Sequence, residues 1–154
     1  VGVERNIFRY RPFEAVVRAS SLTPLADVLR TVFAGLRSGS RVMLSASDPL
    51  PDDVAQLLTR SIGDRPAVAQ YEVETELEFV ERVRLAPPER IRLLGGNAGV
   101  MNVHFDVNPA VALWDHEVTE SGRVEMLPFV REQAVSVTAH RFGAPDPRFL
   151  ALSI

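Results

Sequence analysis

The chain has 154 residues, 46% of them hydrophobic, and its net charge of −3 and pI near 5.6 do not fit the basic surface of a nucleic-acid-binding protein. It contains no cysteine, which excludes disulfides and any reaction that needs a cysteine thiolate from this chain. No stretch approaches the roughly 18 apolar residues of a membrane span and no signal peptide is visible, so we expect a cytoplasmic protein without a membrane partner.

The length predicts one domain, residues 1–154, because a globular chain of this size buries roughly 70% of its unfolded surface. The chain begins with valine instead of methionine, and we expect it to be part of a longer protein. Its stretch 6–12, NIFRYRP, shows no clean period and is expected to cross the surface as an introductory segment, with Arg9 and Arg11 in solvent. A first buried strand is predicted from Val16, Val17 and Ala19.

Capping residues and apolar spacing predict the first two helices. The first begins at Thr23, whose hydroxyl is the expected N-cap before a proline at the first helical position. An apolar stripe follows at helical spacing until Gly39 closes the helix. Asp52 or Asp53 is expected to cap the second helix, which carries apolar residues as far as Ile62.

A third helix is predicted to begin at Thr75, with acidic residues in its first turn where the helix dipole favours them, and to end before Pro87. Short apolar runs at 41–44, 67–71 and 91–94 predict further strands between the helices. Strand–helix units that repeat about every 25 residues imply right-handed crossovers. The sequence therefore predicts an α/β, Rossmann-like fold, in which helices cover both faces of a parallel sheet.

This alternation stops after Asn108, where residues 111–114 predict one more strand and a polar turn follows. We expect residues from about 110 to 154 to form this strand and a projecting C-terminal hairpin or arm. Tyr71 and Trp114 are expected to be core aromatic residues.

The least generic segment is 122–143, GRVEMLPFVREQAVSVTAHRFG. Pro128 cannot lie deep inside a helix, so we predict a short helix that begins near Leu127. From Val135 apolar and polar residues alternate, which predicts a half-buried strand that ends at 140–143. The edge of such a terminal strand is unpaired unless a partner covers it.

The residues EQAVSVTAHRFG at 132–143 resemble the end of the long proline utilization A proteins and of related actinobacterial glutamate-semialdehyde (1-pyrroline-5-carboxylate) dehydrogenases. In those proteins a non-catalytic copy of the aldehyde dehydrogenase nucleotide domain follows the working dehydrogenase. The N-x-x-R-Y-x-P segment at 6–12 is similar to the one that introduces this extra domain. AGLRSGSRVMLSASD at 34–48 resembles the aldehyde dehydrogenase segment A-L-A-A-G-N-x-V-V-L-K-P-S-E, whereas 56–90 is only generically similar.

The resemblance also indicates where a nucleotide would bind. The G-x-G-x-x-G fingerprint is missing from the first strand–helix unit, but aldehyde dehydrogenases do not use it. Ser45 stands at the position of the family's lysine that holds the adenosine ribose, and a short hydroxyl cannot reproduce that long cation. The turn LGGNAGV at 94–100 corresponds to the family's T-G-S turn near the cofactor phosphates. Gly95, Gly96 and Asn97 are therefore weak candidates for cofactor binding, and their glycines fit a simple tight turn better.

Other polar residues offer no recognisable catalytic or metal site. His104 and Asp106 with His116 provide nitrogen and oxygen ligands, but their spacing is not that of a known metal site, so we predict none. Glu125 and Glu132 are seven residues apart and are expected to be solvated or ion-paired instead of acting as a catalytic pair.

Our hypothesis is a non-catalytic structural and interaction domain of a 1-pyrroline-5-carboxylate dehydrogenase, an oxidoreductase of proline catabolism. The resemblance implies a partner, the catalytic aldehyde dehydrogenase domain of the same polypeptide or of a second protomer, whose substrate tunnel the C-terminal tail covers. It also implies NAD in the parent enzyme, while this chain binds no cofactor. The expected interaction residues are Arg131, Glu132, Gln133, Val135, Val137, His140, Arg141 and Phe142.

Two alternatives remain open. The chain is either a small nucleotide-binding domain whose 95–99 turn holds a phosphate, or a free-standing α/β homo-oligomer whose C-terminal strands pair across a two-fold axis. We expect no nucleic-acid partner in any of these cases.

Overall fold

The computed structural model describes residues 4–62, 65–66, 68–96, 98–104, 111–138, 140–141 and 144–145. The chain divides into two compact units. We call Pro12–Val130 the sheet unit and Val1–Arg11 with Arg131–Ile154 the ribbon unit. Among the described residues, no helix combines the length and the hydrophobicity needed to cross a bilayer.

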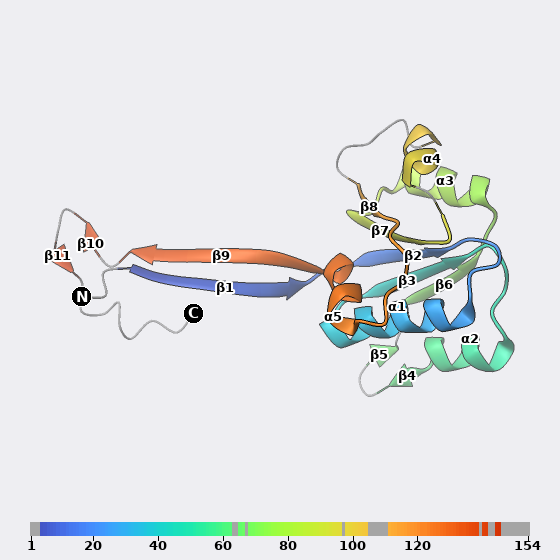
Figure 1. Ribbon diagram of the computed structural model, residues 1–154, viewed down its shortest axis with the longest axis horizontal. Helices are drawn as coiled ribbons and strands as arrows, with labels where there is room; N and C mark the ends of the chain where they lie inside the picture. Colours follow the sequence, from blue (N-terminus) through green and yellow to red (C-terminus); the bar gives the residue numbers. More distant parts are fainter. Residues whose placement is uncertain are drawn as a thin grey trace. The chain divides into compact units, whose positions relative to one another are not determined.

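Five parallel strands in the order β6-β3-β2-β7-β8 form the sheet of the sheet unit (Figure 1). Counted along the chain within this sheet, the order is 3-2-1-4-5, the strand order of a doubly wound dinucleotide-binding fold. The predicted α/β, Rossmann-like fold is therefore confirmed. The strands are β2 (Ala15–Ala19), β3 (Val42–Ala46), β6 (Gln70–Val73), β7 (Arg90–Leu94) and β8 (Ala112–Trp114).

Helices cover both faces of this sheet, with α1 and α2 on one face and α3 and α4 on the other (Figure 1). Side chains alternate across β2, so that Val17 belongs to the apolar cluster under α1 and Val16 to the cluster under α3. Phe129 and Phe79 are fully buried in these two clusters, and each contributes about 1.5–3 kcal/mol through burial. The helices are α1 (Leu25–Ser38), α2 (Asp52–Thr59), α3 (Glu76–Leu85) and α4 (Ala98–His104).

Two predicted helix caps were wrong. The Thr23 hydroxyl does not cap α1, because it donates instead to the carbonyl oxygens of Ser20 at 2.7 Å and Leu94 at 3.1 Å. α1 therefore begins one residue after Pro24, and it ends as predicted at Gly39, which has φ 86°. In α2 the N-cap is Pro51, so the two aspartates are helical, and the helix ends at Thr59 before Ile62. Ile62 lies in the short strand β4 (Ser61–Ile62), which pairs with β5 (Arg65–Pro66).

The start of α3 is confirmed as a capping box. The Thr75 hydroxyl accepts a hydrogen bond from the Glu78 backbone N–H, and the Glu78 carboxylate accepts one from the Thr75 backbone N–H at 2.8 Å. The hydrogen bonds that the Glu78 carboxylate accepts from the Thr75 backbone N–H and from the Thr75 hydroxyl lower the pKa of Glu78. Of the predicted core aromatic residues, Tyr71 packs against the core under α1 and its hydroxyl accepts from the Leu50 N–H, while Trp114 is partly buried.

The segment between β8 and the ribbon unit ends in two short helical turns, α5 (Gly122–Glu125) and the 3-10 helix η1 (Leu127–Phe129). The helix predicted near Leu127 is therefore a single 3-10 turn, with one further turn before it. Phe129 anchors this region: its carbonyl accepts from the Phe13 N–H at 3.0 Å and from the Ser40 hydroxyl. Arg90 donates to the carbonyls of Leu127, Pro128 and Val130.

The ribbon unit contains β1 (Glu4–Pro12) and β9 (Val130–Thr138), which pair and run in opposite directions (Figure 1). The alternating strand predicted around Val135 is confirmed, but it begins five residues earlier and ends at Thr138, before the predicted end at 140–143. Residues 6–12 are mostly exposed, as predicted, but the predicted lack of a period was wrong, because arginines and aromatic residues occupy alternate positions of a true strand. β10 (His140–Arg141) pairs with β11 (Ala144–Pro145).

Candidate functional site

The strand order of the sheet reverses between β2 and β7, and ligands of open α/β sheets bind outside the carboxyl ends of such strands. Here the two loops at this point contact each other. The Ser20 N–H donates to the Leu94 carbonyl at 2.9 Å. A Cβ atom on Gly95, which has φ 69°, would lie 3.1 Å from Thr23 Oγ1, and one on Gly96 would lie 3.3 Å from Ser20 Oγ. The candidate glycines thus form a tight turn against the loop that follows β2.

The amino end of α4, to which a phosphate would be expected to bind, already faces a carboxylate of the chain. The Ala98 N–H donates to Asp115 Oδ2 at 2.9 Å. Asn97, the third candidate for cofactor binding, lies outside the described residues. Gly95 and Gly96 therefore precede a helix whose first N–H already donates to an acid of the chain.

Ser45, which stands in place of the family's lysine, is 1% exposed and lies inside a polar cluster. Its hydroxyl accepts from Arg18 Nη1 at 2.7 Å and donates to Glu74 Oε1 at 2.6 Å. Arg18, fully buried, also donates to Ser47 at 2.8 Å and to Glu76 at 3.2 Å. Its guanidinium lies 4.8 Å from the centre of the Phe79 ring, which adds a cation–π contact.

Sequence reasoning did not find Arg18, although one signal was present. An arginine in the middle of the buried strand AVVRA needs charged and hydrogen-bonding partners, and neighbouring strands are the nearest source of them. Ser45, Ser47 and Glu74 provide them from β3 and from the residues that follow β3 and β6. At this edge the Ser45 hydroxyl is therefore bonded within the chain, to Arg18 and to Glu74.

Glu74 is the acid that closes this cluster. Arg82 donates to it in a bidentate arrangement, from Nη2 at 2.6 Å and from Nε at 3.1 Å. Partial burial alone would raise the pKa of Glu74. The hydrogen bonds from Arg82 and Ser45, together with the charges of Arg82 and Arg18, outweigh burial and lower it.

Glu74→Gln is expected to reduce stability at neutral pH and to make it less sensitive to acid. The native pKa of Glu74 is below its ordinary value of 4.5, so its contribution is present above pH 4.5 and is lost as the pH falls through the native pKa. Urea unfolding at pH 7 and at pH 3 measures both effects. Glu72→Gln is the control, because Glu72 is exposed in the adjoining strand β6 and accepts from the Gln70 amide at 3.1 Å. An equal pH response in both variants would contradict the role of Glu74.

A second buried ion pair lies on the opposite face of the sheet. Arg92 is fully buried and Glu125 is 1% exposed, and two guanidinium nitrogens lie 3.3–3.4 Å from the carboxylate. The Thr119 N–H also donates to Glu125 at 2.9 Å. Burial lowers the pKa of Arg92, and the charge of Glu125 opposes this shift only in part. Glu125 is therefore ion-paired, as predicted, but it is buried in the core instead of standing on the surface.

No cluster of three potential metal ligands occurs among the described residues. His116 Nε2 lies 3.4 Å from Glu125 Oε1, beside the ion pair just described. The side chain of His104 and all of Asp106 lie outside the described residues.

The predicted interaction residues of β9 divide between the two faces of the ribbon. Gln133 accepts from Arg9 Nε at 2.7 Å on one face, and Glu132 accepts from the Tyr10 hydroxyl at 3.3 Å on the other. Because side chains alternate, Arg131, Val135 and Val137 share the face of Gln133. Of the remaining predicted residues, His140 and Arg141 form β10, and Phe142 lies outside the described residues.

These features define a Rossmann-like α/β domain in which the described residues of the usual nucleotide edge bond to one another. No family model and no curated protein matches the chain. Among solved structures, the chain is similar to proline utilization A from Corynebacterium freiburgense, with a TM-score of 0.53 and 26% identity over 92% of this chain and 11% of that one. Histidinol dehydrogenase from Elizabethkingia anophelis matches at a TM-score of 0.45 and 15% identity, over 83% of this chain and 37% of that one.

The chain thus spans about a ninth of the length of the proline utilization A that it matches. The similarity supports a domain related to a segment of that protein.

Proposed function

We propose that this chain is a non-catalytic structural and interaction domain of a proline-catabolic 1-pyrroline-5-carboxylate dehydrogenase. The observation that carries the proposal is the similarity to proline utilization A, which covers 92% of this chain at 26% identity. Two features support the absence of catalysis. The chain has no cysteine to attack an aldehyde, and Ser45 is buried in an internal cluster at the position of the family's ribose-binding lysine.

The ribbon is the element best suited to reach a partner. A two-stranded sheet alone is marginally stable in water, because it has no third strand and no layer to bury its side chains. β1 and β9 form such a sheet, and Phe8 and Tyr10 remain 61% and 53% exposed on it. A partner would add a strand or an apolar surface to the ribbon, with backbone hydrogen bonds for affinity and alternating side chains for register.

The proposed partner is the catalytic aldehyde dehydrogenase domain of the same polypeptide or of a second protomer. NAD would be bound by that domain and not by this chain. The residues proposed to contact or cover it are Arg131, Glu132, Gln133, Val135, Val137, His140, Arg141 and Phe142.

Deletion of residues 135–154 from the longer enzyme is expected to lower dehydrogenase activity, or the transfer of the intermediate between active sites. The reason is that β1 then lacks the last four of the nine residues of its partner strand β9, and the tail no longer covers the tunnel. Steady-state assays, with thermal unfolding of the catalytic domain as the control for folding, measure this effect. Unchanged activity together with unchanged assembly would contradict the covering role.

The alternative of a nucleotide-binding domain that uses the 95–99 turn has less support, because the Ala98 N–H, a potential phosphate donor, already donates to Asp115 within the chain. Calorimetric titration of the isolated chain with NAD at low salt tests it. No heat of binding is expected, and a dissociation constant of about 1 mM or tighter, roughly 4 kcal/mol of binding free energy, would favour the nucleotide-binding alternative.

A further inference from the structure

Leu22 lies in the turn that follows β2, at the carboxyl edge of the sheet. The Thr23 N–H closes this turn by donating to the Ser20 carbonyl at 3.2 Å, and the Leu22 N–H donates to Asp48 Oδ2 at 3.3 Å. Leu22 has φ 65° and is 94% exposed. It therefore combines a left-handed backbone with an apolar side chain that contacts almost nothing.

Folding alone gives no reason for leucine at this position. Positive φ brings Cβ too close to the following carbonyl, so turns of this kind favour glycine or asparagine. Single exposed leucines are common on protein surfaces, but they do not ordinarily carry a backbone penalty as well. The Leu22 side chain is 94% exposed, so any burial of it would have to come from a contact outside the chain.

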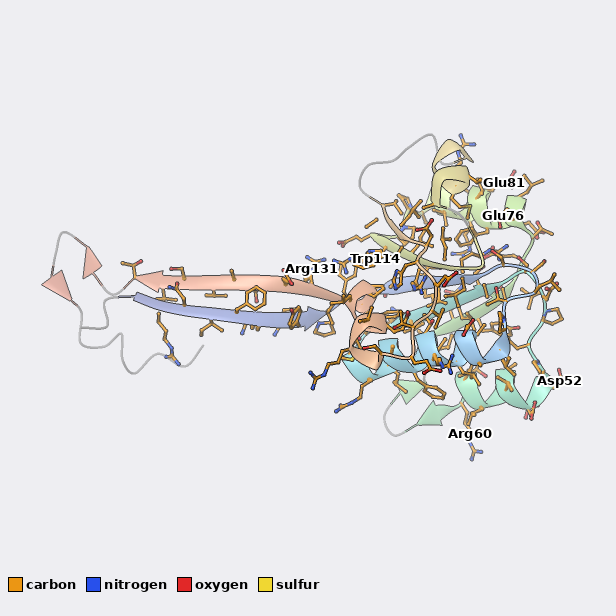
Figure 2. The ribbon with its side chains drawn as sticks, viewed as in Figure 1. Asp52, Arg60, Glu76, Glu81, Trp114 and Arg131 are labelled. Carbon is orange, nitrogen blue, oxygen red and sulfur yellow. The ribbon has the colours of Figure 1, made fainter. Side chains whose placement is uncertain are left out.

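The carboxyl edge of the sheet to which Leu22 belongs carries exposed apolar and acidic side chains. Val73 at the end of β6 is 49% exposed, and Leu77 in the first turn of α3 is 73% exposed. The two arginines of this edge, Arg18 and Arg82, donate inward to Glu74. Figure 2 shows Asp52 and Glu76 at the side of the sheet unit where β2, β3 and β6 end. The exposed acids of this edge are Asp48, Asp52, Asp53, Glu72, Glu76 and Glu78.

We propose that this carboxyl edge, centred on Leu22, is a second docking surface, whose partner is another part of the parent enzyme that presents an apolar socket bordered by arginine or lysine. The acids complement such a border and repel both the phosphates of a nucleotide and the headgroups of anionic lipids. The existence of a parent enzyme rests on the proposed function, but the docking surface does not depend on the ribbon.

The first test uses the isolated chain. Leu22→Asn and Leu22→Gly are expected to raise the thermal midpoint by a few degrees, because both residues accept positive φ. The matched control is Leu85→Asn, since Leu85 is 89% exposed but lies in the ordinary backbone at the end of α3, and no rise is expected there. A midpoint that does not rise in either Leu22 variant would overturn the argument that leucine is costly at this turn.

The second test uses the parent enzyme with a photo-crosslinking amino acid at position 22. Crosslinks to an apolar segment outside residues 1–154, with arginine or lysine beside it, are expected, and Leu22→Asp should lower the yield of assembled enzyme at least severalfold. Absence of crosslinks would overturn the docking surface, whereas an inert deletion of 135–154 would overturn only the role of the ribbon. Co-sedimentation of the chain with phosphatidylserine vesicles is expected to be negative. Vesicle binding that depends on Leu22 would instead indicate that the partner of this surface is a membrane and not a protein.

Discussion

Arg92→Ala is expected to lower the free energy of unfolding by about 3–5 kcal/mol, which is a large share of the stability of a domain of this size. The variant leaves the Glu125 carboxylate, 1% exposed, without its guanidinium partner inside the core. It also removes the donor to the carbonyl oxygens of Leu93 and Trp114. The segment from β8 to α5 therefore loses its ion pair and its hydrogen bond to the guanidinium of Arg92 in the sheet.

Urea unfolding followed by circular dichroism measures this loss. The double variant Arg92→Met with Glu125→Leu is the informative control, because a buried ion pair can be replaced by apolar residues of similar size at little cost. We expect the double variant to recover most of the stability that the single variant loses. A single variant within about 1 kcal/mol of the wild type would show that the pair does not organise this core.

Gly35→Ala is expected to destabilise the sheet unit by about 1–3 kcal/mol, although the same change in an open helix interior stabilises by roughly 0.5–1 kcal/mol. A Cβ atom at position 35 would lie 2.5 Å from Val42 Cγ2 and 2.9 Å from Phe129 Cε1. Both neighbours are buried, and valine is stiff about its first side-chain torsion. The extra methyl would therefore push α1 away from β3 and from η1.

Gly122→Ala in α5 is the matched control, because a methyl group at position 122 would meet no atom within 4 Å. Thermal or urea unfolding of both variants decides the sign of the effect. The control is expected to be neutral or slightly stabilising. If Gly35→Ala were as stable as this control, the close approach of α1 to the sheet would not depend on glycine.

Most of the fold could be predicted because local and tertiary preferences agree. The Thr75 capping box and the Gly39 helix end depend only on residues nearby in the sequence, so local sequence patterns were enough to predict them. Thr23 also fits the local pattern of an N-cap, but this prediction was wrong, because its hydroxyl donates to the carbonyl of Leu94, 71 residues further along the chain. Such a competing hydrogen-bond acceptor cannot be predicted until the order of the strands in the sheet is known.

The site was harder to predict than the fold. The substitution of the family's lysine by Ser45 was visible, but the identity of its hydrogen-bonding partners depends on the register of β2, β3 and β6. Arg18 pairs with Ser45 across β2 and β3 in that register. The strand at 4–12 was missed because its arginines lie on one face and its aromatic residues on the other. A search for apolar–polar alternation does not detect this pattern.

The pairing of β1 with β9 has a consequence for biosynthesis. Arg9 and Gln133, which bond across the ribbon, are 124 residues apart, so at about 5–20 residues per second β1 is translated roughly 6–25 s before its partner strand. During this interval β1 has no partner strand, and an unpaired strand edge can pair with other chains. The arginines at positions 5, 9 and 11 interrupt that stretch with like charges, as gatekeepers do. These charges would then protect the ribosome-bound chain before any interface has formed.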